Sequence, residues 1–185
     1  MANPLFDRVL PKESAARGQL IECKGKVGDF ERLVEIIEAD LAVVPEDIRP
    51  QRWRAEPVDI RLEFGWVDGL QGIPGITGRA SAHIPVVCQR CLEAFELSLD
   101  ASLKMLVVKP GEWPDLPEYE VWELEEEALR LVDLVEESLV MAMPLAPSHD
   151  SLESCARPAV ENTESGPEKV RPFADLKSQM EKSNN

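Results

Sequence analysis

Strict alternation of apolar and polar side chains marks the middle of the chain. Apolar residues occupy every second position in three long runs, at 58–66, 76–86 and 95–105. A repeat of two is the period of a β-strand with one buried side and one solvent-facing side. A short corner joins the last two runs, so they should be antiparallel neighbours. Small residues on the second run indicate a crowded or strongly curved sheet. They are Gly78, Ala80 and Ala82.

Two other segments carry the helical repeat. Residues 30–41 and 128–142 place apolar side chains three and four positions apart, as amphipathic helices do. Asp29 is the expected N-cap of the first helix, since its carboxylate can accept from the open N–H groups of the first turn. Shorter strands are expected at 5–10, 19–23 and 119–124, with a loop at 110–118. These elements predict an α+β fold: a curved antiparallel β-sheet, which could be barrel-like, with two main α-helices.

The composition changes after Cys155. Residues 156–170 are polar and read as a flexible linker, because they offer little apolar surface to bury. Residues 171–177 could form a short terminal helix with two apolar anchors. We therefore predict a single α+β domain over 1–155, followed by a flexible, partly disordered C-terminal tail over 156–185.

Charge is spread unevenly along the chain. The net charge is −15, and residues 111–137 alone hold eleven acidic side chains and one basic one, Arg130. We call 111–137 the acidic segment. Its charge argues against a protein that coats nucleic acid, which needs clustered Lys and Arg. It could instead engage a basic partner, or it could be a solubilising face. The candidate partner-binding residues are Glu123, Glu125, Glu126 and Glu127.

One short basic cluster could serve RNA binding. Three arginines surround a tryptophan, so the cluster could grip phosphates and stack on a base. Its candidate RNA-binding residues are Arg49, Arg52, Trp53 and Arg54, which Arg79 and Arg90 would join on one basic face of the sheet. The alternative is a solvated loop whose Trp53 packs on the core.

A C-x-x-C pair, Cys88 and Cys91, lies at the corner between the last two long strands. This spacing lets a tight turn place both sulfurs on one metal ion. Cys155 could supply a third ligand and His149 a fourth, which would make a structural zinc site that ties the tail to the hairpin. A corner with two reduced thiols and a redox pair are the alternatives. Cys23 is most simply a strand residue.

Catalytic signals are weak. Nucleophilic catalysis needs a nucleophile beside a base that a third group orients. His83 lies on the polar side of a predicted strand, and the residues around His149 form no sequence-defined triad. We therefore expect a protein that is not an enzyme.

Four cysteines do not make a disulfide scaffold, and the chain shows no signal peptide and no run near the ~20 apolar residues that span a membrane. A cytoplasmic location without membrane contact is expected.

Four stretches resemble one protein family when they are taken in order. They are Val87-Cys88-Gln89-Arg90-Cys91-Leu92-Glu93, then Ala142-Met143-Pro144-Leu145-Ala146-Pro147-Ser148-His149-Asp150, then Cys155, then Arg171-Pro172-Phe173-Ala174-Asp175-Leu176. The pattern resembles the YceD family, the large ribosomal RNA subunit accumulation proteins. Its specific motifs fall in 84–95, 139–155 and 171–177, and Arg171 replaces the family's usual Asn.

The resemblance implies a bacterial factor in ribosome biogenesis. Members of the family support the synthesis, processing or stability of large-subunit (23S) ribosomal RNA. The resemblance does not give the mechanism. The acidic balance favours a ribosomal protein or a pre-ribosomal particle as the partner, reached mainly through protein contacts. Direct contact with ribosomal RNA through an arginine-rich face is the alternative. The resemblance assigns no catalytic residue.

Overall fold

The computed structural model describes residues 3–67, 72–151 and 154–155. The predicted tail at 156–185, with its short helix at 171–177, lies outside these residues. The strands are β1 (Arg8–Val9), β2 (Leu20–Lys26), β3 (Pro57–Trp66), β4 (Pro74–Val87), β5 (Ala94–Val108), β6 (Glu120–Glu123) and β7 (Leu129–Arg130). The α-helices are α1 (Pro11–Arg17), α2 (Glu31–Leu41) and α3 (Leu131–Ala142). Short 3-10 helices are η1 (Pro4–Phe6), η2 (Val27–Asp29), η3 (Glu46–Ile48) and η4 (Trp53–Ala55).

Five strands form the main sheet in the order β2-β3-β4-β5-β6, and β1 pairs with β7 separately. Neighbours from β2 to β5 are antiparallel, as predicted, and the short corner does join β4 to β5. Strand β6 instead runs parallel to β5, with Met105 opposite Glu120 and Val108 opposite Glu123. A purely antiparallel sheet was therefore wrong, because residues 109–119 return the chain along β5 before β6 begins. The barrel-like alternative was also wrong, since β2 and β6 stay unpaired edges among the described residues.

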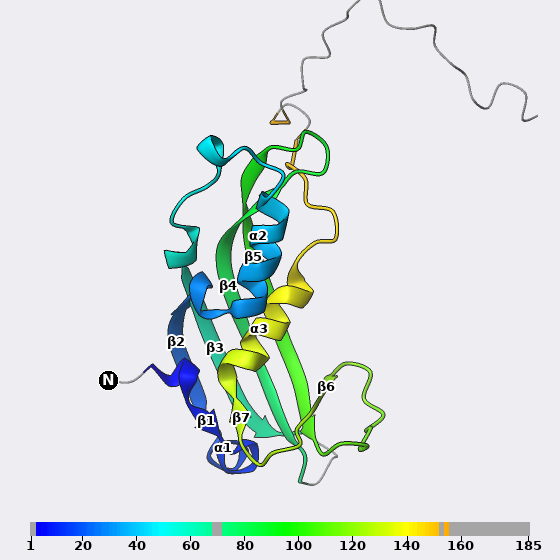
Figure 1. The fold of residues 1–185 in the computed structure, drawn as a ribbon. Coiled ribbons are helices and arrows are strands. Elements are labelled where there is room, and N and C mark those ends of the chain that lie inside the picture. Colours follow the sequence, from blue (N-terminus) through cyan, green and yellow to red (C-terminus); the bar gives the residue numbers. More distant parts are fainter. Residues whose placement is uncertain (1–2, 68–71, 152–153, 156–185) are drawn as a thin grey trace, which may run out of the picture.

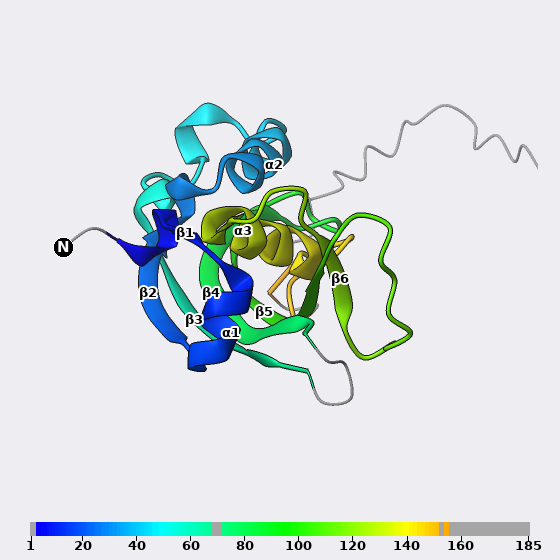
Figure 2. The ribbon, with the colours of Figure 1, turned by 90° about the horizontal axis from the view of Figure 1, so that it is seen from below.

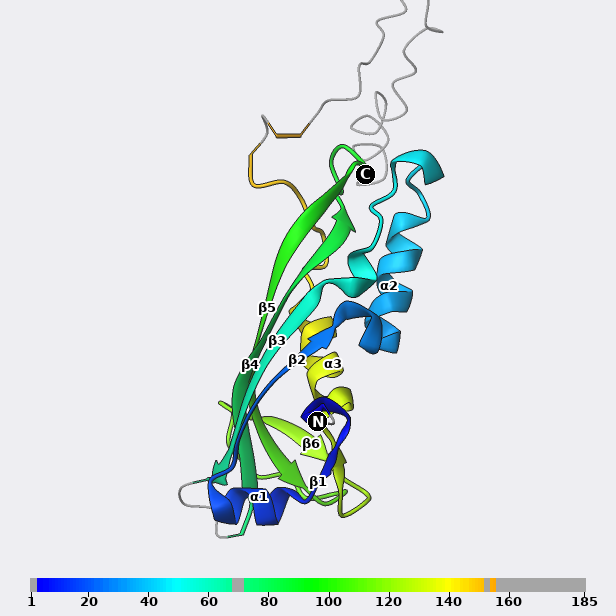
Figure 3. The same cartoon turned by 90° about the vertical axis from the view of Figure 1, so that its left-hand side faces the viewer.

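Helices α2 and α3 lie on the same face of this sheet, with α2 against β4 and α3 against β5 (Figure 1, Figure 3). The view along the strands shows the sheet as one layer and these helices as a second (Figure 2). Helix α1 packs at one end of the sheet, against β3 and β4. Of the helices in the described residues, none is long and apolar enough to cross a membrane. The fold is thus a two-layer α+β arrangement.

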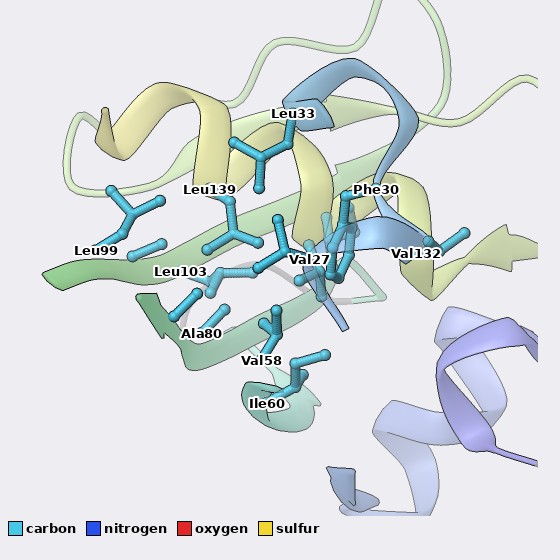
Figure 4. Packing of buried hydrophobic residues seen from close by; sticks show 14 of the residues in the cluster. Val27, Phe30, Leu33, Val58, Ile60, Ala80, Leu99, Leu103, Val132 and Leu139 are labelled. Atoms are coloured by element: carbon cyan, nitrogen blue, oxygen red, sulfur yellow. The ribbon is translucent and has the colours of Figure 1, made fainter. Parts of the chain in front are cut away.

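The core lies between the two layers (Figure 4). Burial along β3 follows the predicted repeat of two: Val58, Ile60, Leu62 and Phe64 are buried. Helix α2 buries one stripe, formed by Leu33, Val34, Ile37 and Leu41. Each large apolar side chain that is fully buried stabilises the fold by about 1.5–3 kcal/mol. At the end of β3 the pattern fails, since Trp66 is 46% exposed.

The first thirty residues depart most from expectation. The strand predicted at 5–10 is shorter than expected, because η1 occupies its start and only Arg8–Val9 pairs as a strand. Helix α1 follows directly, with Pro11 at its first position and Gly18 in the left-handed conformation at its end. Asp29 does not cap α2: Phe30 is the N-cap, and the Asp29 carboxylate accepts from the Lys26 N–H (2.8 Å). The intervening turn η2 accounts for this difference, since it takes Asp29 into its own last position.

Gly78 confirms the crowding predicted for the sheet. It lies opposite Leu62 in the pairing of β3 and β4. A side-chain carbon at this position would clash with the backbone carbonyl oxygen of Arg61. Only glycine therefore allows the two strands to approach each other this closely.

The longest strands, β4 and β5, place their connecting turn at one end of the molecule (Figure 1). The Asp40 carboxylate, near the end of α2, accepts from the Val87 N–H (2.6 Å) and ties the last residue of β4 to the helix layer. Helix α3 ends at Ala142, and the chain then continues to the same turn. Two segments that are distant in the sequence meet there.

Candidate metal centre

A tight turn at Cys88–Glu93 joins β4 to β5, and we call it the cysteine turn. The Cys88 N–H donates to the Glu93 carbonyl (2.9 Å), and the Leu92 N–H donates to the Cys88 carbonyl (2.9 Å). Leu92 takes a positive φ of 63°, which reverses the chain after Cys91. The Arg90 N–H points at the Cys88 sulfur (3.5 Å). Such N–H···S contacts favour a thiolate at Cys88.

The second half of the site comes from residues 143–151 and 154–155, which we call the C-terminal segment. The Gln89 N–H donates to the Pro147 carbonyl (2.9 Å), and the Arg90 guanidinium donates to the His149 carbonyl. The Phe95 ring lies 4.5 Å from the His149 imidazole, centroid to centroid. These contacts hold the C-terminal segment against the cysteine turn and orient the imidazole.

The four predicted ligands converge, and we call them the metal cluster: Cys88, Cys91, His149 and Cys155. Their ligand atoms all lie within 4.8 Å of one another. The sulfurs of Cys88 and Cys155 are 3.8 Å apart, and the Cys91 sulfur is 3.6 Å from His149 Nδ1. Bond lengths at tetrahedral zinc, ~2.3 Å to sulfur and ~2.0 Å to nitrogen, imply ligand separations of about 3.8 Å and 3.5 Å. The cluster could therefore bind a metal ion.

The pKa values of the two buried thiols of the cluster are shifted in opposite directions. Burial opposes ionisation of Cys88, but the backbone N–H groups of Cys91, Arg90 and His149 outweigh it and lower the pKa of the thiol to about 5. Burial and the neighbouring thiols raise the pKa of Cys155 to about 11. A metal ion would favour the thiolate at both positions, because thiolate is the ligand form.

The four residues of the cluster differ in their exposure to solvent. Cys88 is fully buried and Cys155 is 9% exposed, whereas Cys91 and His149 are half-buried. The remaining cysteine, Cys23, lies on β2 as predicted, and burial raises its pKa. It takes no part in the cluster. Four protein ligands would close the coordination sphere, which is typical of a structural site.

The arginine cluster is not a free basic face. Arg49 donates to the carbonyls of Val44 (2.6 Å) and Ala42 (3.0 Å), so its guanidinium forms hydrogen bonds with the backbone that follows α2. Arg54, in η4, pairs with Glu38 of α2. Trp53 is half-buried against the core, as the alternative interpretation of this cluster held.

The other arginines lie elsewhere. Arg52 is exposed, with a positive φ of 63°. Arg79 pairs with Asp100 on the sheet face that points away from α2, and Arg90 lies in the cysteine turn. The structure therefore does not gather the predicted arginines on one surface.

The four candidate glutamates lie at the opposite end of β5, and all are exposed. Glu123 accepts from the Gly111 N–H (3.1 Å), and Glu126 pairs with Arg8. Glu125 and Glu127 form no ion pair with any described residue. They remain candidates for contact with a partner.

Reasoning from the sequence missed three contacts of the site. They are made by Asp40, by Phe95, and by the Arg90 guanidinium, which binds the His149 carbonyl. Phe95 offered one signal, because an aromatic residue two positions after the cysteine turn lies close to any ligand held there. Asp40 offered none, since it depends on where the end of α2 meets β4.

Comparison with known proteins agrees with this arrangement. The family model for the large ribosomal RNA subunit accumulation protein YceD matches residues 76–178, which include the cysteine turn and the C-terminal segment. A protein of that name from Haemophilus influenzae is 33% identical over 134 residues, covering 67% of this chain and 75% of the relative. No solved structure matches the chain. The chain belongs to the YceD family.

Proposed function

We propose that this protein is a non-enzymatic ribosome-biogenesis factor of the cytoplasm. It supports the synthesis, processing or stability of large-subunit 23S ribosomal RNA. Membership of the YceD family supports this role, because both the family and the Haemophilus influenzae relative are named for accumulation of the large ribosomal RNA subunit. It acts by binding a ribosomal protein or a pre-ribosomal particle.

The metal cluster holds one structural zinc ion in this proposal. The observation that carries the assignment is the convergence of three sulfurs and one imidazole nitrogen within 4.8 Å. Thiolate and imidazole ligands suit zinc, whereas magnesium and calcium prefer oxygen. Bound zinc would join the C-terminal segment to the cysteine turn and add its binding free energy to the folded state.

The acidic segment supplies the contact with the partner. Glu123, Glu125, Glu126 and Glu127 are exposed, and of these four only Glu126 has a basic partner among the described residues, so their field extends into solvent. A basic ribosomal protein is the partner that this charge attracts. We favour this surface over the arginine cluster because Arg49 and Arg54 are already occupied by contacts with the end of α2 and with Glu38.

Metal content tests the zinc assignment. The purified protein should hold about one zinc ion per chain, by elemental analysis, because one set of four ligands is present. The double variant Cys88→Ser/Cys91→Ser should lose it. Cys23→Ser is the matched control and should keep it, since Cys23 lies outside the cluster. Absence of metal in protein purified without chelator would overturn the assignment.

Cells that lack the protein test the role. They should accumulate less large-subunit ribosomal RNA, measured against small-subunit RNA, and the intact gene should restore the level. Turnover of ribosomal RNA by the purified protein alone would contradict the non-enzymatic role.

A further inference from the structure

The three sulfurs of the metal cluster differ in their access to solvent. Cys88 is fully buried and Cys155 nearly so, at 9% exposure, while Cys91 is half-buried. The Cys91 sulfur lies beside the half-buried imidazole of His149 (3.6 Å) and makes a surface contact with the Glu93 carboxylate (3.9 Å). A small oxidant that reaches the cluster therefore meets the Cys91 sulfur first.

The cluster also holds a second thiol within reach of the first. The sulfurs of Cys88 and Cys155 each lie within 4.8 Å of the Cys91 sulfur, so either can reach it after a small movement. A disulfide needs its sulfurs at about 2.05 Å, and all of these cysteines are free in the structure. The cluster is thus a reduced site that has its own resolving thiol.

We infer that Cys91 is an oxidation site and that the metal cluster is a peroxide-responsive clamp between the cysteine turn and the C-terminal segment. The inference rests on the zinc site proposed above. The oxidant is hydrogen peroxide, which can reach the half-buried Cys91 but not the buried Cys88.

The chemistry proceeds in two balanced steps. The Cys91 thiolate attacks one peroxide oxygen, the O–O bond breaks, and a sulfenic acid forms while hydroxide leaves and becomes water. The thiolate of Cys88 or Cys155 then attacks the Cys91 sulfur, an S–S bond forms, and the S–O bond breaks to release a second water. Two thiolates lose two electrons in total, two protons are consumed, and one peroxide is reduced to two waters.

Loss of metal follows from this disulfide. It removes two of the three thiolate ligands and leaves one cysteine and His149, too few to hold a structural zinc ion. Zinc leaves without a change in its oxidation state. Thiol reductants together with zinc should close the clamp again.

The experiment uses the full-length, zinc-loaded Cys23→Ser variant, in which every remaining cysteine belongs to the cluster. Zinc content is measured first. Hydrogen peroxide is then added, and zinc release is followed with a metal-binding dye. Free thiols are counted, and disulfides are mapped by mass spectrometry. The expected result is loss of one zinc ion and two thiols per chain, with Cys91 in the disulfide, and recovery with dithiothreitol and zinc.

The possible failures are distinguishable. Protein that holds no metal before oxidant is added overturns the zinc site and the switch with it. Protein that holds zinc but keeps it under peroxide, or releases it with all thiols still free, overturns the switch and leaves the zinc site standing. A disulfide between Cys88 and Cys155 would overturn Cys91 as the oxidation site.

Discussion

The two ends of β5 use polar side chains in opposite ways. Before the strand, the cysteine turn and the C-terminal segment bring four ligand atoms within 4.8 Å, held by backbone hydrogen bonds between the two segments. After it, the four candidate glutamates of the acidic segment spread like charges over an exposed surface, where only Glu126 has an ion-pair partner among the described residues. One end brings the ligands of a complete site together, and the other leaves the charge of its glutamates largely unbalanced.

Distance keeps the two ends independent. Strand β5 spans Ala94–Val108, 15 residues, or about 50 Å at ~3.3 Å per residue. Substitutions this far apart, with no shared neighbours, have additive effects. Changes at the metal cluster should therefore alter stability, and changes in the acidic segment should alter binding. Each of the following predictions tests that division.

Removing the metal should produce the largest effect. A ligand present at a thousand times its dissociation constant stabilises a fold by about 4 kcal/mol. Chelation, or Cys155→Ser, should lower Tm by roughly 10 °C, since about 1 kcal/mol corresponds to ~2–4 °C in a chain of this size. Differential scanning calorimetry with and without chelator measures the shift, and Cys23→Ser should respond to chelator as the wild type does. An unchanged Tm would mean that the cysteine turn is stable without metal.

Neutralising the acidic segment should alter binding alone. Replacing Glu123, Glu125, Glu126 and Glu127 with Gln removes four exposed charges, each worth about 0.5 kcal/mol against a basic partner. The expected loss is about 2 kcal/mol, or roughly thirtyfold in affinity for pre-ribosomal particles. Co-sedimentation at several salt concentrations measures the loss and should show a shallower salt dependence.

A matched variant controls for net charge. Glu31→Gln, Glu35→Gln, Glu46→Gln and Asp47→Asn remove the same number of exposed acids from α2 and the residues after it. This variant should bind nearly as the wild type does, and zinc content should be unchanged in both. Equal losses of affinity in the two variants would show that the partner responds to total charge and that the acidic segment is not its binding surface.

Residue patterns predicted the elements whose signal is repetitive. Alternation located β3, β4 and β5 with their buried faces, and helical spacing located α2 and α3. The direction of β6 was not predictable, because alternation gives the same pattern for parallel and antiparallel pairing. Helix α1 was missed because two turns are too short for periodicity, although Pro11 and Gly18 mark its ends.

The metal cluster could be predicted from the sequence, whereas the contacts of the arginine cluster could not. C-x-x-C spacing is a local signal, so Cys88 and Cys91 could be recognised from the sequence, and His149 and Cys155 followed as the candidates to complete a site of four ligands. The partners of Arg49 and Arg54 are set by the way the chain folds back on α2. No local sequence pattern predicts those contacts.

Leu92 gives the smallest effect and the sharpest contrast between the two ends. Both ends contain a residue at positive φ: Gly111 in the acidic segment (83°) and Leu92 in the cysteine turn (63°). Glycine adopts this conformation freely, whereas for leucine it costs about 1–2 kcal/mol. Leu92→Gly should relieve that strain, lose part of the gain to unfolded-state entropy, and stabilise the protein by about 0.5–1 kcal/mol. Urea unfolding of the zinc-loaded protein measures the difference.

Leu92→Val is the control and should destabilise the protein, because β-branched residues tolerate positive φ poorly. If Leu92→Gly instead weakens the fold, then the Leu92 side chain, 64% exposed, stabilises the cysteine turn by more than its backbone strain costs.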